Sequence, residues 1–148
     1  MISSAFRPDG GMDITVSLTA EEVAAIGSAE AEGLADWFDT ALWGLAMLRT
    51  GEVCRDEGAG TTEIHDAEMD TVVRDLDVKL LPRLAGIRDA AILRHRELGG
   101  SVGSLAAAMD VARSTAQTRL EALENPNPGP RAASSRAWQE WAATAQQD

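Results

Sequence analysis

Hydrophobic and polar residues alternate strictly over residues 13–18, which predicts a half-buried strand. Thr19 follows this strand, and Glu22 lies three residues later, a spacing typical of the capping box that begins a helix. We expect that helix to end near Gly33. No other segment alternates in this way, so we predict no second strand.

A second helix is predicted over residues 34–49, where apolar residues occupy nearly the whole circumference. Phe38 and Leu42 belong to one apolar stripe, while Trp37 and Trp43 extend the apolar surface around the helix. Such a helix is buried on several sides. In so short a chain, we expect a second copy to contribute part of that cover.

One strand followed by two helices resembles the ribbon-helix-helix dimer, in which two strands pair across a twofold axis. A lone strand cannot satisfy its own backbone, so residues 13–49 need such a partner. Ribbon-helix-helix proteins contact DNA with outward strand residues, but here Asp13, Thr15 and Ser17 lie in a strongly acidic segment. We therefore expect this segment to form a homodimer without contacting DNA. The expected dimer interface consists of Ile14, Val16, Leu18, Phe38, Leu42 and Leu45.

The middle of the chain is expected to be a glycine-containing loop followed by two helices. Thr61 or Thr62 can cap a helix that ends near Leu80, and Pro82 is well placed at the start of the next. This next helix, over residues 83–98, ends at Gly99 and Gly100. Its inward residues are expected to be Leu84, Ile87, Ala91 and Leu98, with Arg88, Arg94 and Arg96 outside.

Residues 101–123 predict two short helices joined by a sharp turn. Ser101 is a good N-cap for the first helix, and Asp110 occupies the turn. A small Ala106 inside the first helix and an apolar Val111 after the turn complete a pattern that resembles the helix-turn-helix of bacterial DNA-binding regulators. With residues 83–98 as a supporting helix, the resemblance covers residues 83–123.

This resemblance implies that the helix beginning near Arg113 lies in the major groove of double-stranded DNA. Ala112 stands where the family usually has a capping Ser, so this helix is expected to begin with an uncompensated amide. Ala116 and Leu120 are expected to pack inward. The expected DNA contacts are Ser101, Arg113, Ser114, Thr115, Gln117 and Thr118, together with Arg94 and Arg96.

The charge of the chain is distributed unevenly. The 148 residues carry a net charge of −11, which is unusual for a DNA-binding protein. Residues 1–78 hold 4 basic and 17 acidic residues, a net −13, whereas residues 79–120 hold 7 basic and 3 acidic residues, a net +4. Because nucleic-acid affinity depends on local phosphate neutralisation, this basic block matters more than the sum. An ordinary solvated surface would explain the same block equally well.

The remaining chemistry offers no case for an enzyme or a cofactor. The acidic group around His65 contains metal-ligand types, but its spacing with Cys54 matches no recognised site, and a solvated acidic helix is the better interpretation. His95 is expected to be an exposed bystander. One cysteine cannot form an internal disulfide, and the chain shows neither a membrane-spanning run nor a secretory signal, so we expect a cytoplasmic, bacterial-style protein.

The C-terminal region is expected to be a Pro-rich linker followed by a short helix capped by Ser134 or Ser135. Trp138 and Trp141 of this helix dock on the body or bind a partner, and docking is favoured. The whole chain is predicted to be mainly α. The expected segments are a flexible arm at 1–11, a strand-helix-helix dimerisation segment at 12–50, a loop at 51–62, a helical segment with the helix-turn-helix at 63–123, the linker at 124–133 and the last helix at 134–148.

The sequence thus predicts a homodimeric regulator that binds specific DNA sequences. The alternative is an acidic protein-interaction module, an adaptor or DNA mimic that binds no DNA itself. A weaker alternative is regulation by a small ligand held among the tryptophans. Exposure of Arg113, Ser114, Gln117 and Thr118 on one helix face would favour DNA binding over these alternatives.

Overall fold

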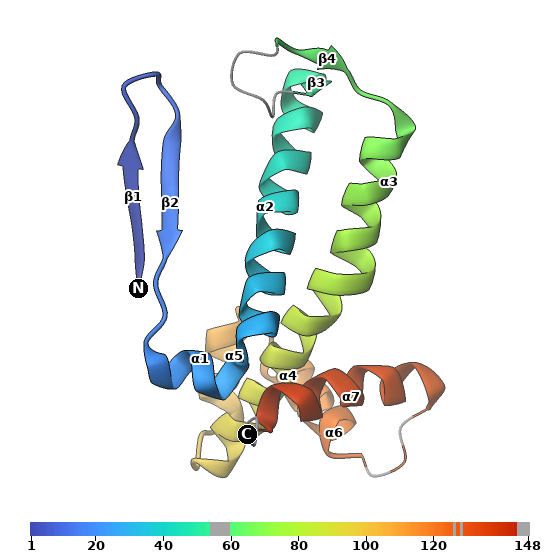
Figure 1. The fold of residues 1–148 in the computed structure, drawn as a ribbon. Helices are drawn as coiled ribbons and strands as arrows, with labels where there is room; N and C mark the ends of the chain where they lie inside the picture. The colour runs from blue at the N-terminus through green and yellow to red at the C-terminus, as the bar shows by residue number, and fades with distance from the viewer. Residues whose placement is uncertain (54–59, 126, 128, 145–148) are drawn as a thin grey trace. The chain divides into compact units, whose positions relative to one another are not determined.

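The fold is mainly α, as predicted (Figure 1). The computed structural model describes residues 1–53, 60–125, 127 and 129–144, so Cys54 and half of the expected loop at 51–62 lie outside the described residues. Two compact units can be distinguished, residues 1–35 and residues 36–144, with the boundary inside α2. The helices are α1 (Ala20–Ile26), α2 (Ser28–Thr50), α3 (Asp66–Arg74), the π-helix η1 (Asp75–Leu80), α4 (Leu81–Glu97), α5 (Val102–Met109), α6 (Arg113–Glu124) and α7 (Pro130–Ala143).

The N-terminal residues form a β-hairpin rather than a flexible arm, which corrects the expectation of a lone strand. β1 (Ile2–Phe6) pairs antiparallel with β2 (Met12–Val16), and Gly10, at φ 89°, makes the turn between them. The partner of β2 is therefore in the same chain, and the backbone argument for strand pairing across a dimer axis no longer holds. β1 escaped prediction because its central residues, Ser3 to Ala5, carry little apolar pattern.

The first two helices meet at Gly27 rather than at Gly33. The capping box of Thr19 and Glu22 is present, as predicted, and begins α1. Gly27 ends α1 with φ 87°, a conformation that glycine adopts without steric cost, and its amide donates to the carbonyl of Val23. Gly33 lies inside α2, so that helix is 23 residues long and begins earlier than expected.

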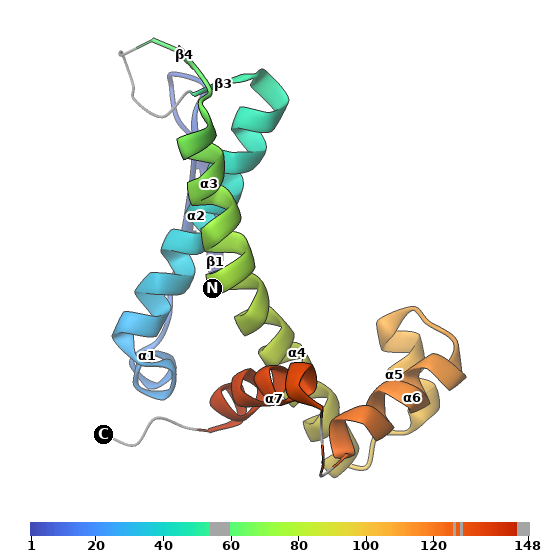
Figure 2. The ribbon, with the colours of Figure 1, turned by 90° about the vertical axis from the view of Figure 1, so that its right-hand side faces the viewer.

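A long continuous helix, α3–η1–α4, runs from Asp66 to Glu97 (Figure 2). The expected break before Pro82 is absent. A proline ring clashes with the carbonyl four residues before it in an α-helix, and the wider π turn of η1 lies at this point. The expected caps Thr61 and Thr62 are also wrong, since Thr62 lies in the short strand β4 (Thr62–Glu63), which pairs with β3 (Glu52–Val53).

Within the second unit, α2 and α3 run antiparallel and are connected through β3 and β4 (Figure 1). The buried face of α2 consists of Thr40, Gly44 and Met47. A Cβ on Gly44 would lie 2.7 Å from a methyl carbon of Val72, so glycine allows the two helices to approach closely here. Phe38, Leu42 and Leu45, which were expected to form a dimer interface, lie on the other side of α2 and are exposed.

Helix α7 docks on α4, which confirms the favoured expectation for the C-terminal tryptophans. The guanidinium of Arg83 lies 4.3 Å from the ring centroids of both Trp37 and Trp138, and Trp141 packs edge-on against Trp138. The space among these rings is thus occupied by a side chain of the protein. Gly129 precedes α7 as its N-cap, so the helix begins before the expected caps Ser134 and Ser135, and residues 130–133 are helix rather than linker.

Candidate nucleic-acid interface

Helices α5 and α6 are joined by a tight turn, at the positions that the sequence predicted. The Ser101 hydroxyl caps α5 by accepting from the amide of Ser104 at 3.0 Å. Asp110 ends α5 in the left-handed conformation at φ 52°, and Val111 then donates its amide to the carbonyl of Ala106. Helix α6 follows Ala112, which makes no side-chain capping bond.

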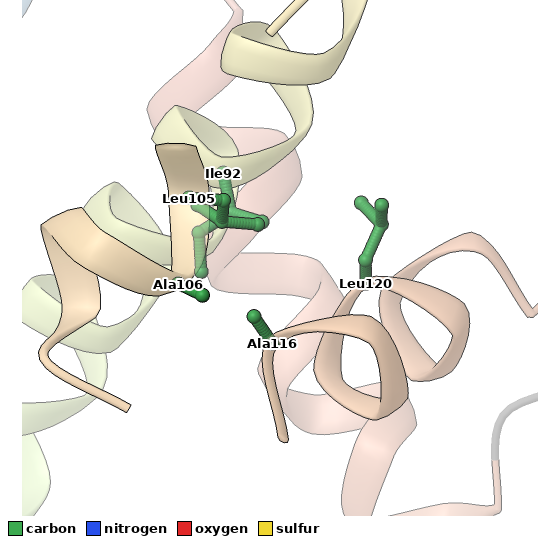
Figure 3. Close-up of a cluster of buried hydrophobic side chains, with 5 residues drawn as sticks. All are labelled: Ile92, Leu105, Ala106, Ala116 and Leu120. Atoms are coloured by element: carbon green, nitrogen blue, oxygen red, sulfur yellow. The ribbon is translucent and has the colours of Figure 1, made fainter. Parts of the chain in front are cut away.

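A small apolar core fixes α6 against α4 and α5. Figure 3 shows Ile92, Leu105 and Ala106 facing Ala116 and Leu120, all at most 5% exposed. Leu93, Val102, Met109 and Leu123 are partly buried around this core. Ala116 and Leu120 therefore pack inward, as expected.

The face that α4 turns inward differs from the predicted one. Its buried residues are Gly86, Asp89 and Ile92, while the expected Ala91 and Leu98 are exposed. Ile87 is also exposed, and Leu84 is half-buried. The prediction failed because it followed apolar residues only, whereas α4 buries a carboxylate.

Asp89 connects α4 to α6 through charge. Its Oδ1 accepts from Arg88 Nε at 3.0 Å and from Arg119 Nη2 at 3.1 Å. Only 6% of the Asp89 side chain is exposed, compared with 35% for Arg119 and 52% for Arg88. A buried carboxylate with two guanidinium partners holds α6 in place beside the apolar core.

The outer face of α6 is polar and exposed. Arg113, Ser114, Gln117 and Thr118 all face solvent, which is the feature expected to separate DNA binding from its alternatives. The Gln117 amide donates to Glu121 Oε1 at 2.6 Å, one turn further along the helix. Thr115 is also exposed, and the Thr118 hydroxyl donates to the carbonyl of Ser114 at 3.0 Å.

Several residues of the basic block have partners within the chain. Arg88 and Arg119 hold Asp89, Arg94 pairs with Glu97 at 2.9 Å, and Arg83 stacks on tryptophans. Among the residues that the structure describes, no carboxylate pairs with Arg96 or Arg113, and both are exposed. The hydroxyl of Ser101 is engaged in capping α5. The cationic surface available to phosphate is therefore smaller than the net charge of the block suggests.

His95, in the last turn of α4, packs against the turn between α4 and α5 and is not a bystander. Its ring covers Gly100, where a Cβ would lie 2.1 Å from the ring, and its Nε2 lies 3.3 Å from the Ser104 hydroxyl.

Across the described residues, no group of three His, Cys, Asp or Glu side chains is placed to hold a metal ion. No helix in the same part of the chain is long and apolar enough to cross a membrane.

Two structural residues of this region were missed by the sequence analysis. Asp89 enters the sequence interpretation only as one of the three acidic residues of the basic block, and nothing local indicates that its partner Arg119 lies 30 residues away. Gly86 was overlooked, although a glycine inside a helical pattern is a known sign of close packing. A Cβ on Gly86 would lie 2.4 Å from the carbonyl oxygen of Trp138.

Comparison with protein-family models, curated proteins and solved structures finds no match to this chain.

Proposed function

We propose that this protein binds double-stranded DNA and contacts bases in the major groove with the outer face of α6, as a transcriptional regulator would. One observation carries the proposal: the polar residues of α6 are exposed together, while its opposite face is held by the core with α4 and α5. A helix held rigidly from behind can present several side chains to base edges in a constant register.

The exposed side chains have the chemistry that base recognition requires. Arg113 can donate two hydrogen bonds to guanine, and Gln117 can pair with the N6 and N7 positions of adenine. The bond from Gln117 to Glu121 uses one amide hydrogen and leaves the other hydrogen and the oxygen, which is sufficient for adenine. Ser114 and Thr118 can contact bases or phosphates.

The start of α6 adds a contact for the DNA backbone. The first amides of a helix generally have no partner inside it, and Ala112 supplies no side-chain cap in α6, where the Thr115 amide alone in this turn donates to the Ala112 carbonyl. Amides at a helix N-terminus favour phosphate groups. The positive charges of Arg96 and Arg113 also favour contact with phosphate.

Selection of bound duplexes from a random DNA library tests the proposal. We expect an enriched sequence, and we expect Gln117→Ala to weaken binding to it by about 1–3 kcal/mol while relaxing selectivity at one base pair. Arg113→Ala should act in the same way if it contacts a base, or should weaken all duplexes equally if it contacts phosphate. Arg74→Ala, which removes an exposed arginine from α3, serves as the matched control and should leave binding unchanged.

A library that yields no enriched sequence, together with equal binding by wild type and Gln117→Ala, would overturn this proposal. The acidic protein-interaction module would then be the better account of the chain.

A further inference from the structure

Residues 36–50 of α2 have two opposite faces, one buried and one exposed. Thr40, Gly44 and Met47 pack inside the unit. The outer face carries four large apolar residues that remain exposed: Phe38 at 48%, Leu42 at 55%, Leu45 at 53% and Leu48 at 70%. A partner can therefore cover this outer face without displacing the packing of Thr40, Gly44 and Met47.

The spacing of the outer face is that of a coiled coil. Phe38, Leu42, Leu45 and Arg49 follow one another at intervals of four, three and four residues, as the a and d positions of a heptad do. The small Ala41 and Ala46 flank this stripe, so another helix can approach closely. A narrow stripe of this kind fits one helix rather than a broad surface.

We propose that the occupant is the α2 helix of a second copy of this chain, packed antiparallel about a twofold axis between Leu42 and Leu45. In this arrangement Leu42 lies against the partner subunit's Leu45. Phe38 lies against the partner subunit's Arg49, whose guanidinium can stack on the ring.

The distribution of charge selects the second copy and its direction. Arg49 is at the C-terminal end of the stripe, whereas Asp36 and Asp39 are at its N-terminal end. An antiparallel pair brings each arginine to the acidic end of the other helix, and it also opposes the two helix dipoles. A parallel pair would place arginine beside arginine and aspartate beside aspartate.

The area of the stripe predicts a weak dimer. With roughly 150–200 Å² for each large apolar side chain, the exposed fractions amount to about 400 Å² per copy, or about 800 Å² for the pair. Stable interfaces bury about 1,200 Å² or more in total, so we expect dissociation in the micromolar range rather than the nanomolar range. The proposal does not depend on DNA binding.

Sedimentation velocity of the full chain, from about 1 µM to about 500 µM, covers the range expected for an interface of this size. We expect a reversible monomer–dimer equilibrium, and Leu45→Lys should weaken it about 100-fold or more. Leu81→Lys is a closely matched control, because Leu81 is a leucine of α4 with the same exposure of 53%. Circular dichroism should show that both variants keep the helical content of wild type.

Cysteine cross-linking in a Cys54→Ser background tests the direction of the helices. Protomers with Leu42→Cys mixed with protomers carrying Leu45→Cys should cross-link faster than either variant alone. Faster cross-linking within each single variant would instead indicate a parallel pair and overturn the proposed arrangement. A monomer at every concentration, or equal weakening by Leu45→Lys and Leu81→Lys, would overturn the interface itself.

Discussion

Replacing Asp89 by alanine tests whether charge holds α6 in position. The substitution removes the acceptor of two hydrogen bonds and leaves Arg119 with no carboxylate partner at the junction of α4 and α6. Breaking a fully buried ion pair by removing one partner costs about 3–5 kcal/mol. Arg88 and Arg119 are 52% and 35% exposed, so water can replace part of the lost interaction. We therefore expect a loss of about 2–3 kcal/mol of unfolding free energy.

Urea denaturation, followed by circular dichroism, measures this loss. Asp77→Ala is the matched control, because Asp77 is exposed in the same long helix and both variants gain the same helix propensity. It should change the unfolding free energy by no more than about 0.5 kcal/mol.

A double-mutant cycle with Arg119→Ala isolates the interaction of Asp89 with that residue. We expect a coupling energy of about 1–2 kcal/mol, because the pair shares one hydrogen bond in a largely buried site. A coupling energy below about 0.5 kcal/mol would refute the reasoning and assign the stability of the junction to the apolar core alone.

One further prediction concerns packing and two concern electrostatics. Gly86→Ala should destabilise the protein by about 1–3 kcal/mol in the same urea assay, because its Cβ would overlap the backbone of Trp138. Gly103→Ala is the control and should be neutral or stabilising, because a Cβ there would meet nothing closer than 3.7 Å. Glu121→Ala should raise affinity for random DNA and lower selectivity, since it removes a negative charge and releases Gln117; equal selectivity would argue against a positioning role. The logarithm of DNA affinity should fall as the logarithm of salt concentration rises, with a slope of about −2 to −4 per protomer that corresponds to two to four phosphates. A flat salt titration would exclude phosphate contact as the main contribution to affinity.

The helices of the candidate interface could be predicted because their signals are local. Ser101 caps the helix that immediately follows it, and Asp110 adopts its left-handed conformation at the turn it was expected to form. The glycines after α4 likewise end the helix they follow, with φ 86° at Gly99. Each of these effects acts within a few residues, so a single sequence contains the information that decides it.

The packing of α2 could not be predicted in the same way. Apolar residues surround this helix, so hydrophobic periodicity cannot decide which side faces the interior. Thr40 and Gly44 decide it, because small side chains let α2 approach Val72 and Asp75, and these contacts span about thirty residues of sequence. The larger apolar residues are left outside. The buried Asp89 escaped prediction for the same reason, since its environment depends on a distant helix.

The two proposals together explain how an acidic chain could bind DNA selectively. Asp89 engages two arginines of the basic block inside the fold, and a third pairs with Glu97, so few cations remain for phosphate. If α6 binds DNA as proposed, its sequence-independent affinity should consequently be low, and base contacts should contribute a larger share of the binding energy. Two such helices joined by a micromolar α2 interface would bind adjacent half-sites with the benefit of effective concentration. Binding should therefore rise steeply with protein concentration near the dissociation constant of the dimer, and Leu45→Lys should remove this steepness while leaving the base preference of α6 unchanged.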